Sequence, residues 1–312
     1  MSGSAVVDIV LPVFCFIGIG YLVVATRLLG ESVADGLAAF VFVVPVPLLL
    51  FRATATLDVP DFNPWPFWGA YFAGAALNTV IGVLVVRLFG RDGRTSVIGG
   101  MSAAFANTVM VGMPLVATAY GEAGLVVVLT LIAVHLPIMM AVSAVMIEVA
   151  EGAGGRIGMA LRRVALGLVK NPMIVAIAAG LLYRATGLPL GGMPRTVIDA
   201  VAETAIPLAL MALGMSLHRY GVRGTVAPAA VLSIAKLLIM PAVVYLLGTT
   251  VFDLPPIALA VAVTVAAAPT GANAYLIATR FQTGLALSAN TITLTTAVAV
   301  VSLGFWISLF LP

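Results

Sequence analysis

The sequence predicts an all-α membrane protein of about ten transmembrane helices, in two inverted five-helix repeats with broken, crossing fourth and ninth helices. Three observations predict this class: a very apolar composition, a series of long apolar segments, and an internal repeat. Hydrophobic residues make up 62% of the chain and charged residues 9%, whereas soluble domains are about half apolar and about a quarter charged. A water-soluble fold could not bury this much apolar surface.

Ten apolar segments are long enough to span a bilayer, because one crossing needs about 20 apolar residues. They lie near residues 5–26, 33–53, 65–89, 95–118, 122–148, 165–186, 196–217, 225–250, 255–280 and 285–311. The first is expected to be a retained helix, since residues 1–5 lack the positive charge of a signal peptide and Asp8 interrupts its apolar region.

The basic residues predict an orientation. With the N-terminus outside, eleven Lys and Arg residues fall on the cytoplasmic side and three on the outer side, and cytoplasmic loops are enriched in these residues. The eleven are Arg27, Arg87, Arg91, Arg94, Arg156, Arg162, Arg163, Lys170, Arg219, Arg223 and Arg280. Both termini are therefore expected on the outer side of the inner (plasma) membrane. Trp65, Trp68 and Trp306 would lie at the outer interface as anchors.

An internal repeat divides the chain into residues 1–150 and 151–312. The matching positions are Pro12 with Pro172, residues 20–26 with 180–186 and 46–50 with 206–210 at an offset of 160, and residues 115–118 with 276–279 after a slip of one residue. Because each repeat holds an odd number of spans, the second copy enters the membrane from the opposite side. Inverted repeats of this kind are typical of transporters that work by alternating access.

Two segments carry signals for interruption near half-depth. The fourth contains Asn107, Gly112 and Pro114, and the ninth contains Pro269, Gly271 and Asn273. Proline removes a backbone donor and glycine weakens a helix, and unpaired backbone groups at this depth must lie against protein or a watery cavity. Helix ends created there would offer positive dipole ends to a carboxylate. The predicted solute-binding set is Asn107, Thr108, Gly112, Pro114, Pro269, Gly271 and Asn273.

Three ionisable residues are further candidates. Lys236 lies deep in the eighth segment, where an ammonium costs at least about 2.5 kcal/mol and needs a partner. Arg52, at the outer end of the second segment, could attract an anion. His135 could line the pocket or carry a proton, although a lone histidine in a helix more often serves packing.

The chain resembles the auxin efflux carrier family over essentially its whole length. The resemblance rests on Lys170-Asn171-Pro172, on residues 206–214 (IPLALMALG), on Lys236-Leu237 with Pro241, and on Ala268-Pro269. It implies a scaffold domain and a transport domain that each interleave helices from both repeats, a relationship in fold to bile acid symporters, and an elevator-like movement. A homodimer formed through the scaffold domain is also expected.

The resemblance also implies roles for individual residues. The family's crossover positions fall on Asn107, Pro114, Pro269 and Asn273, and its eighth-helix lysine falls on Lys236. In the plant auxin exporters an acidic residue of the third helix accompanies that lysine, and the matching position here is Asn78. Because Asn78 is uncharged, it cannot form a charge pair with Lys236. The long cytoplasmic loop of many plant members is absent, since the central connection covers only about residues 149–164.

The function expected from these features is secondary transport of a small organic anion, such as an auxin-like acid or a dicarboxylate. A sodium-coupled organic anion symporter is the alternative, although no Asp or Glu lies within residues 101–114 or 266–280 and a site would need hydroxyls such as those of Thr108, Thr264 and Thr270. A membrane receptor and an intramembrane enzyme are alternatives of a different class. The substrate, the direction and the coupling ion are not readable.

Cofactor, metal and nucleic-acid sites are not expected. The single cysteine, Cys15, cannot form a disulfide framework or a multi-cysteine metal site. No basic stripe or nucleic-acid motif accompanies the net charge of +3. The expected partners are the small organic anion and the lipid bilayer.

Overall fold

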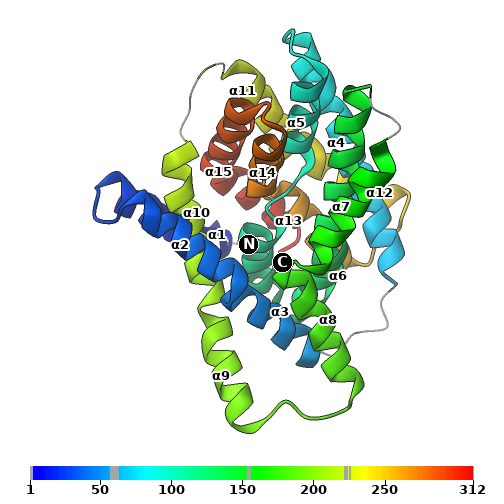
Figure 1. The fold of residues 1–312 in the computed structure, drawn as a ribbon. Coiled ribbons are helices and arrows are strands. Elements are labelled where there is room, and N and C mark those ends of the chain that lie inside the picture. The colour runs from blue at the N-terminus through cyan, green and yellow to red at the C-terminus, as the bar shows by residue number, and fades with distance from the viewer. Residues whose placement is uncertain (1–2, 57–62, 153–155, 221–223, 225, 312) are drawn as a thin grey trace. The chain divides into compact units, whose positions relative to one another are not determined.

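The structure, a computed structural model, describes residues 3–56, 63–152, 156–220, 224 and 226–311 (Figure 1). Helices account for 86% of it, and no strand occurs in the described part of the chain. The only extended pairing found there is an isolated antiparallel bridge between Ala106 and Thr270. The prediction of an all-helical protein is therefore confirmed. Arg223, one of the predicted cytoplasmic residues, lies outside the described residues.

The helices form two compact units, and each unit draws on both halves of the chain. Unit 1 comprises Met1–Leu11, Asn63–Val164 and Tyr220–Pro312, and unit 2 comprises Pro12–Phe62 and Ala165–Arg219. The helices of unit 1 are α4 (Pro64–Leu88), α5 (Gly93–Ala104), η1 (Thr108–Gly112), α6 (Met113–Ala150), α11 (Ala227–Ile234), η3 (Ala235–Ile239), α12 (Met240–Thr250), α13 (Pro256–Ala267), α14 (Ala272–Phe281) and α15 (Leu285–Ser308). The helices of unit 2 are α2 (Glu31–Val43), α3 (Pro45–Thr56), α8 (Pro172–Ala185) and α9 (Gly192–Glu203). Three helices contribute residues to both units: α1 (Gly3–Ala25), α7 (Ile157–Val169) and α10 (Ala205–Tyr220).

Seven helical stretches in the described residues are long and apolar enough to cross a membrane, or eight if the bent pair α7 and α8 forms one span. The number is below ten because the predicted spans at 95–118 and 255–280 are divided into shorter helices, each ended by an interruption. The second part of the former runs on into α6. Gly121, at φ 61° and ψ −150°, is non-helical and divides α6 into two segments near the predicted boundary.

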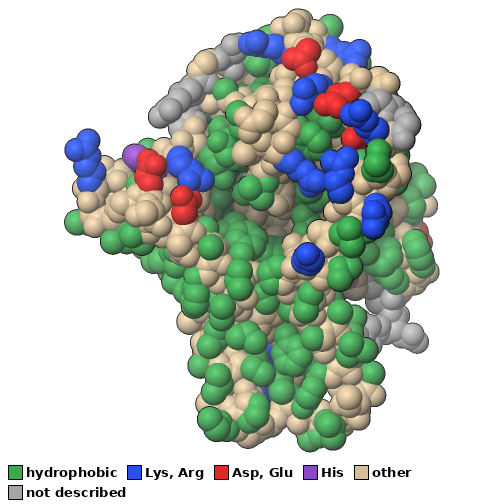
Figure 2. Space-filling view, in the orientation of Figure 1, with side chains coloured by type: hydrophobic (Ala, Val, Ile, Leu, Met, Phe, Trp, Pro, Cys, Tyr) green, Lys and Arg blue, Asp and Glu red, His purple; other side chains and the backbone are tan. Residues whose placement is uncertain are grey.

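Charged side chains concentrate at one end of unit 1 (Figure 2). Figure 2 shows Lys and Arg gathered where α5 begins and along α7. Asp92 is the N-cap of α5: its Oδ1 accepts from the Thr95 backbone N–H at 2.9 Å, and its Oδ2 accepts from the Thr95 hydroxyl at 2.7 Å. These hydrogen bonds lower the pKa of the Asp92 carboxyl below its ordinary value of 3.8.

Unit 2 is built on two close helix crossings that use glycine. A Cβ atom on Gly20 of α1 would overlap the backbone carbonyl of Met211 on α10, and a Cβ on Gly180 of α8 would lie 2.6 Å from the carbonyl oxygen of Phe51 on α3. Small residues allow membrane helices to approach this closely, where dispersion and interhelical contacts replace the hydrophobic effect. Thr54 of α3 adds a hydroxyl hydrogen bond of 3.4 Å to the Ile177 carbonyl of α8.

The crossing of α1 with α10 predicts a large effect of a single methyl group. Gly20→Ala should destabilise the protein by about 1–3 kcal/mol, since the backbone of Met211 cannot yield as a side chain would. Gly18→Ala is the control on the same helix, because a Cβ there has nothing within 4 Å, and it should be neutral or stabilising. Thermal unfolding in detergent measures both; equal melting temperatures for the two variants would contradict this close approach.

The Asp92 cap predicts a pH-dependent loss of stability. Asp92→Ala should cost about 1 kcal/mol at neutral pH, the usual value of a helix N-cap. Because the folded pKa is depressed, the charged cap contributes fully above about pH 3.8 and its contribution is lost as the pH falls through the lower folded pKa. Asp92→Asn, which keeps an acceptor, is the control. A penalty for Asp92→Ala that is the same at pH 3 and pH 7 would rule out the charged carboxylate as its source.

Candidate functional site

The two interruptions predicted from the sequence meet inside unit 1. The backbone N–H of Asn107 donates to the Pro269 carbonyl at 2.8 Å, and that of Gly271 donates to the Phe105 carbonyl at 2.8 Å. With the Ala106–Thr270 bridge between them, the two extended segments pair antiparallel. Two half-helices, α5 and α13, end at this crossing, and two, η1 with α6 and α14, begin there.

The crossing satisfies most of the backbone groups that the interruptions release. Thr270 donates its backbone N–H to the Thr295 hydroxyl of α15 at 3.1 Å and its own hydroxyl to the Ser102 carbonyl at 2.7 Å. Gly271 lies so close to the other segment that a Cβ would be 3.1 Å from the Ala106 carbonyl oxygen. Glycine is therefore the residue that permits the two backbones to pair.

Asn107 both caps a helix and keeps a free donor. Its side-chain Oδ1 accepts from the Met110 backbone N–H at 3.3 Å, so it is the N-cap of η1. The residue is only 6% exposed, and its Nδ2 has no hydrogen-bond partner among the described residues. A buried amide donor without an acceptor is costly, so this N–H group is poised for an acceptor supplied from outside the chain.

The N-terminus of α14, the second helix that begins at the crossing, has no side-chain cap among the described residues. Gly271 is the N-cap of α14 and has no side chain to accept from the first turn. Asn273 lies in that first turn, is half-buried, and forms no side-chain hydrogen bond within the described part of the chain. The two asparagines therefore occupy different positions: Asn107 is the N-cap of η1, whereas Asn273 lies inside α14.

Thr108 and His135 belong to the support of the crossing. His135 is 3% exposed, and its Nδ1 lies 3.1 Å from the Thr108 hydroxyl while its Nε2 lies 3.2 Å from the Tyr71 hydroxyl. The Phe105 ring packs edge-on against the imidazole at 5.0 Å. Both ring nitrogens thus lie within hydrogen-bond distance of a hydroxyl group of the chain.

Gly112 and Pro114 shape the helix that leaves the crossing. Pro114 cannot donate to the Met110 carbonyl, and the preceding turn is the π-helix η1, in which the Met113 N–H reaches the Thr108 carbonyl. A Cβ on Gly112 would make ordinary contact with Val265 of α13 at 3.5 Å. Single π-turns of this kind are frequent at functional sites.

Lys236 and Asn78 cover the two helix C-termini at the crossing. The Lys236 ammonium, on a residue with 0% exposure, donates to the Ala266 carbonyl, and the Asn78 amide donates to the Ala103 carbonyl. Ala266 and Ala103 are the second-last residues of α13 and α5. A helix C-terminus carries partial negative charge, so both donors lie where they stabilise it.

A second π-turn surrounds Lys236. In η3 the Met240 N–H reaches the Ala235 carbonyl, and Pro241 cannot donate to the Leu237 carbonyl. The Trp306 indole N–H takes that place at 2.9 Å. Trp306 is 7% exposed, so its predicted role as an interfacial anchor is wrong: its polar edge is used inside the protein.

Arg52 lies in unit 2. Its Nη1 is 3.2 Å from Asp199 Oδ1, and Arg195 is 3.3 Å from the other oxygen of the same carboxylate. Its guanidinium is thus engaged in an ion pair within its own unit, as expected for a charge that lies near apolar surroundings. Among the described residues no group of three or more His, Cys, Asp or Glu side chains could hold a metal ion.

Sequence reasoning missed the hydroxyl-bearing side chains that support the crossing. They are Tyr71, which contacts His135, Thr295 of α15, and Tyr120, whose hydroxyl lies 2.9 Å from that of Thr264. A signal was present in α15, where the buried residues Ser288, Thr291 and Thr295 recur every three or four positions. That spacing marks one face of a helix, and a polar face inside an apolar segment indicates buried partners.

Comparisons with known proteins find matches to membrane transport proteins. The chain matches the family model described as "Membrane transport protein" over residues 5–307. It is similar to a protein of Methanothermobacter thermautotrophicus named "Uncharacterized transporter", with 27% identity over 241 residues and 75% of each chain covered. It is also similar to a protein of Rhizobium meliloti named "Putative malonate transporter", with 26% identity over 308 residues, 95% of this chain and 93% of the other.

The two C-terminal caps predict opposite effects on stability. Asn78→Leu leaves the Ala103 carbonyl unpaired and should cost about 1–3 kcal/mol. Lys236→Met also loses a hydrogen bond but removes a buried ammonium, whose burial costs at least about 2.5 kcal/mol. It should therefore leave the melting temperature in detergent unchanged or raise it. A clear drop for Lys236→Met, matching that of Asn78→Leu, would show that this lysine stabilises the fold as an ordinary cap.

Proposed function

Because the chain belongs to the membrane transport protein family, we propose that it is a secondary transporter that carries a small organic anion through the crossing in unit 1. The match over residues 5–307 also confirms the resemblance to the auxin efflux carrier family. Both relatives reported above are named as transporters, which favours a transporter over the receptor and enzyme alternatives. The observation that carries the proposal is the buried, unpartnered Nδ2 of Asn107 beside two helix N-termini.

The electrostatics of the crossing favour an anion. The negative C-terminal ends of α5 and α13 are each covered by a donor, from Asn78 and Lys236. Among the described residues, the only side-chain cap on the positive N-terminal ends of η1 and α14 is the acceptor that Asn107 gives to Met110. A carboxylate is the group that this arrangement of open donors binds best.

A dicarboxylate is the substrate class to test first. The relative from Rhizobium meliloti carries malonate in its name, and malonate is a small acid with two carboxylates. Asn107 and Asn273 would donate to one carboxylate, together with the first-turn N–H groups of α14. No full positive charge is required beside it, which allows the solute to leave again.

Contacts at equivalent positions support the ten-span inverted repeat. In unit 2, Gly20 meets Met211 and Gly180 meets Phe51. The offset of 160 found in the sequence relates Gly20 to Gly180 and Phe51 to Met211, so the two contacts are equivalent in the two repeats. In unit 1, each interruption donates one backbone hydrogen bond to the other. Counting the interrupted segments as single spans, and dividing α6 at Gly121, gives the ten spans that we propose.

We assign unit 1 to the transport domain and unit 2 to the scaffold domain of an elevator-type carrier. Both interruptions, both π-turns and both caps belong to unit 1. Each unit combines segments from before and after residue 150, the interleaving expected for this class. The outer location of both termini and a dimer formed through unit 2 are parts of the same proposal.

A sodium-coupled symporter is the second candidate. Three oxygens on elements that meet at the crossing are buried without a partner among the described residues: Asn78 Oδ1, Ser102 Oγ and Thr296 Oγ1. Sodium, like other hard cations, is bound through oxygen. Sodium dependence is therefore measured alongside transport.

Counterflow of labelled malonate in proteoliposomes tests the proposal, with sodium replaced by choline in parallel. Asn107→Asp keeps the acceptor for Met110 but replaces the free N–H by a second oxygen, so it should reduce counterflow at least about tenfold while the protein stays folded. Asn107→Ser, which keeps a cap without the amide donor, should also lose counterflow. Thr250→Ala, at an exposed hydroxyl that bonds within its own helix α12, is the control.

The two asparagine variants separate folding from binding. Wild-type counterflow in Asn107→Asp would exclude the Nδ2 donor from the substrate site. Counterflow that needs sodium would select the symporter. An absence of counterflow for every mono- and dicarboxylate offered would overturn the organic-anion proposal itself.

A further inference from the structure

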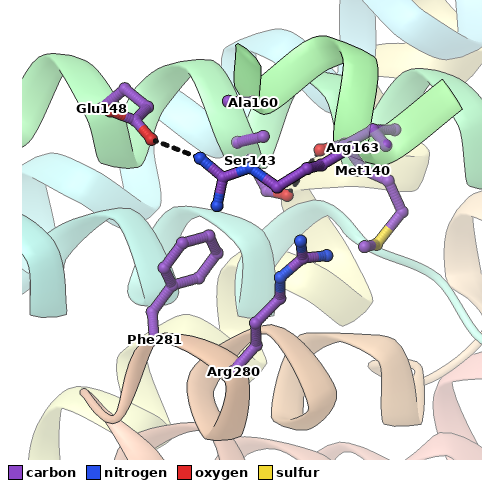
Figure 3. A pocket seen from close by; sticks show the side chains of 9 residues that line it. Met140, Ser143, Glu148, Ala160, Arg163, Arg280 and Phe281 are labelled. Carbon is purple, nitrogen blue, oxygen red and sulfur yellow. Dashed lines mark hydrogen bonds and ion pairs between the residues drawn. The ribbon is translucent and has the colours of Figure 1, made fainter. Parts of the chain in front are cut away.

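A second polar site lies at the opposite end of α14 from the crossing. The C-terminal part of α6, the start of α7 and the end of α14 border a partly open hollow of about 10 Å³, room for one water-sized group (Figure 3). All of its residues belong to unit 1. They are Met140, Ser143, Ala144, Glu148, Ala160, Arg163, Val164, Arg280 and Phe281.

Glu148 presents an acceptor that nothing in the described chain satisfies. The residue is 7% exposed. Its Oε1 lies 3.9 Å from Arg163 Nη2, too far for a hydrogen bond, and its Oε2 is buried without a partner. A buried carboxylate oxygen in this state is costly, so a ligand that fills the hollow should bring a donor to it.

Two guanidinium groups give the hollow a net positive charge. In Figure 3 the Arg280 side chain rises from α14 toward Arg163, and its only recorded contact in the described structure is with the ring of Phe281, at 5.8 Å. The neighbouring carboxylate of Glu151 is paired with Arg94 at 3.2 Å. Two cations therefore face one carboxylate, and guanidinium groups bind phosphate in a bidentate manner.

The walls and the surroundings of the hollow are those of a membrane interface. Met140, Ala144, Ala160 and Val164 supply an apolar lining. The outer face of α7 exposes Met159 and Leu161 next to Arg162, a pattern typical of helices that lie at the lipid headgroup level. Basic pockets between helices at this depth are suited to phospholipid headgroups.

We propose that this hollow binds the headgroup of a membrane phospholipid that carries an N–H or O–H donor beside its phosphate, such as phosphatidylethanolamine or phosphatidylglycerol. The phosphate lies between Arg163 and Arg280, and the ammonium or hydroxyl donates to Glu148 Oε2. Only this donor enters the hollow; the phosphate lies at its open mouth, and the glycerol and acyl carbons lie outside it. A dicarboxylate satisfies the two arginines but offers no donor to Glu148, so it is the poorer ligand.

A bound headgroup would also hold the start of α7 against the end of α14 within unit 1. Val164 is the last residue of unit 1 in α7, and Ala165 begins unit 2. The lipid would therefore fix the point at which the chain leaves unit 1.

Binding of short-chain lipids to the delipidated full-length protein in detergent tests this proposal. Dihexanoyl phosphatidylethanolamine and phosphatidylglycerol should raise the melting temperature, and phosphatidylcholine, which has no N–H or O–H donor, should do so less. Arg280→Gln and Arg163→Gln should weaken binding at least about tenfold, since each removes a charge-assisted hydrogen bond. Arg162→Gln is the matched control, because Arg162 lies on α7 but does not line the hollow.

Further variants keep the test decisive. Arg280→Lys, which retains charge without the bidentate geometry, covers the case in which Arg280→Gln does not fold, and it should bind with intermediate strength. Glu148→Gln should lose the preference over phosphatidylcholine. Equal binding of phosphatidylcholine by the unmodified protein, equal weakening by Arg162→Gln, equal binding of soluble phosphoethanolamine, or displacement of lipid by malonate would each overturn the proposal. No transport assay is involved, so the result is independent of the proposed function.

Discussion

The pairing of two short extended segments inside an apolar protein is the constraint on which unit 1 depends. Each interruption gives one backbone hydrogen bond to the other, but the remaining backbone groups that the interruptions release must also find partners in a place without bulk water. The surrounding polar residues answer that need: Thr270 reaches Ser102 and Thr295, while Thr108 is held through His135 to Tyr71. The buried hydroxyl of Thr295 on α15 thus serves the crossing.

The pairing of the two segments also determines which helix ends, and so which partial charges, meet at the crossing. An interrupted helix creates a negative and a positive end together, so a symmetric crossing alone would favour neither anions nor cations. The asymmetry arises because side-chain donors cover the carbonyl ends, at Ala103 and Ala266, whereas the N–H ends keep free capacity at Asn107 and the first turn of α14. The difference is made by Asn78 and Lys236, which need not touch the solute to select its charge.

Sequence reasoning found the features that depend on local chemistry. Proline and glycine act within their own segments, so the interruptions near Asn107 and Gly271 and the division of α6 at Gly121 could be predicted. Features that depend on tertiary contact could not. The acceptors of Lys236 and Asn78 are backbone carbonyls, which no residue type marks, and the role of Trp306 follows from a carbonyl that Pro241 leaves free. The two hydroxyl partners of His135, Thr108 and Tyr71, are likewise contacts that its sequence position does not mark.

The two ends of α14 lie near unpaired groups of opposite kind in the described structure, a hydrogen-bond donor at one end and an acceptor at the other. At its first turn α14 meets the segment of Asn107, whose Nδ2 has no partner among the described residues. At its last turn the chain offers the Arg280 guanidinium beside an unpaired acceptor, Glu148 Oε2. A simple anion satisfies the first site completely, whereas the second requires an anion and a donor in one molecule. The ten residues of α14 thus separate the site that we propose for a small carboxylate from the one that we propose for a membrane lipid.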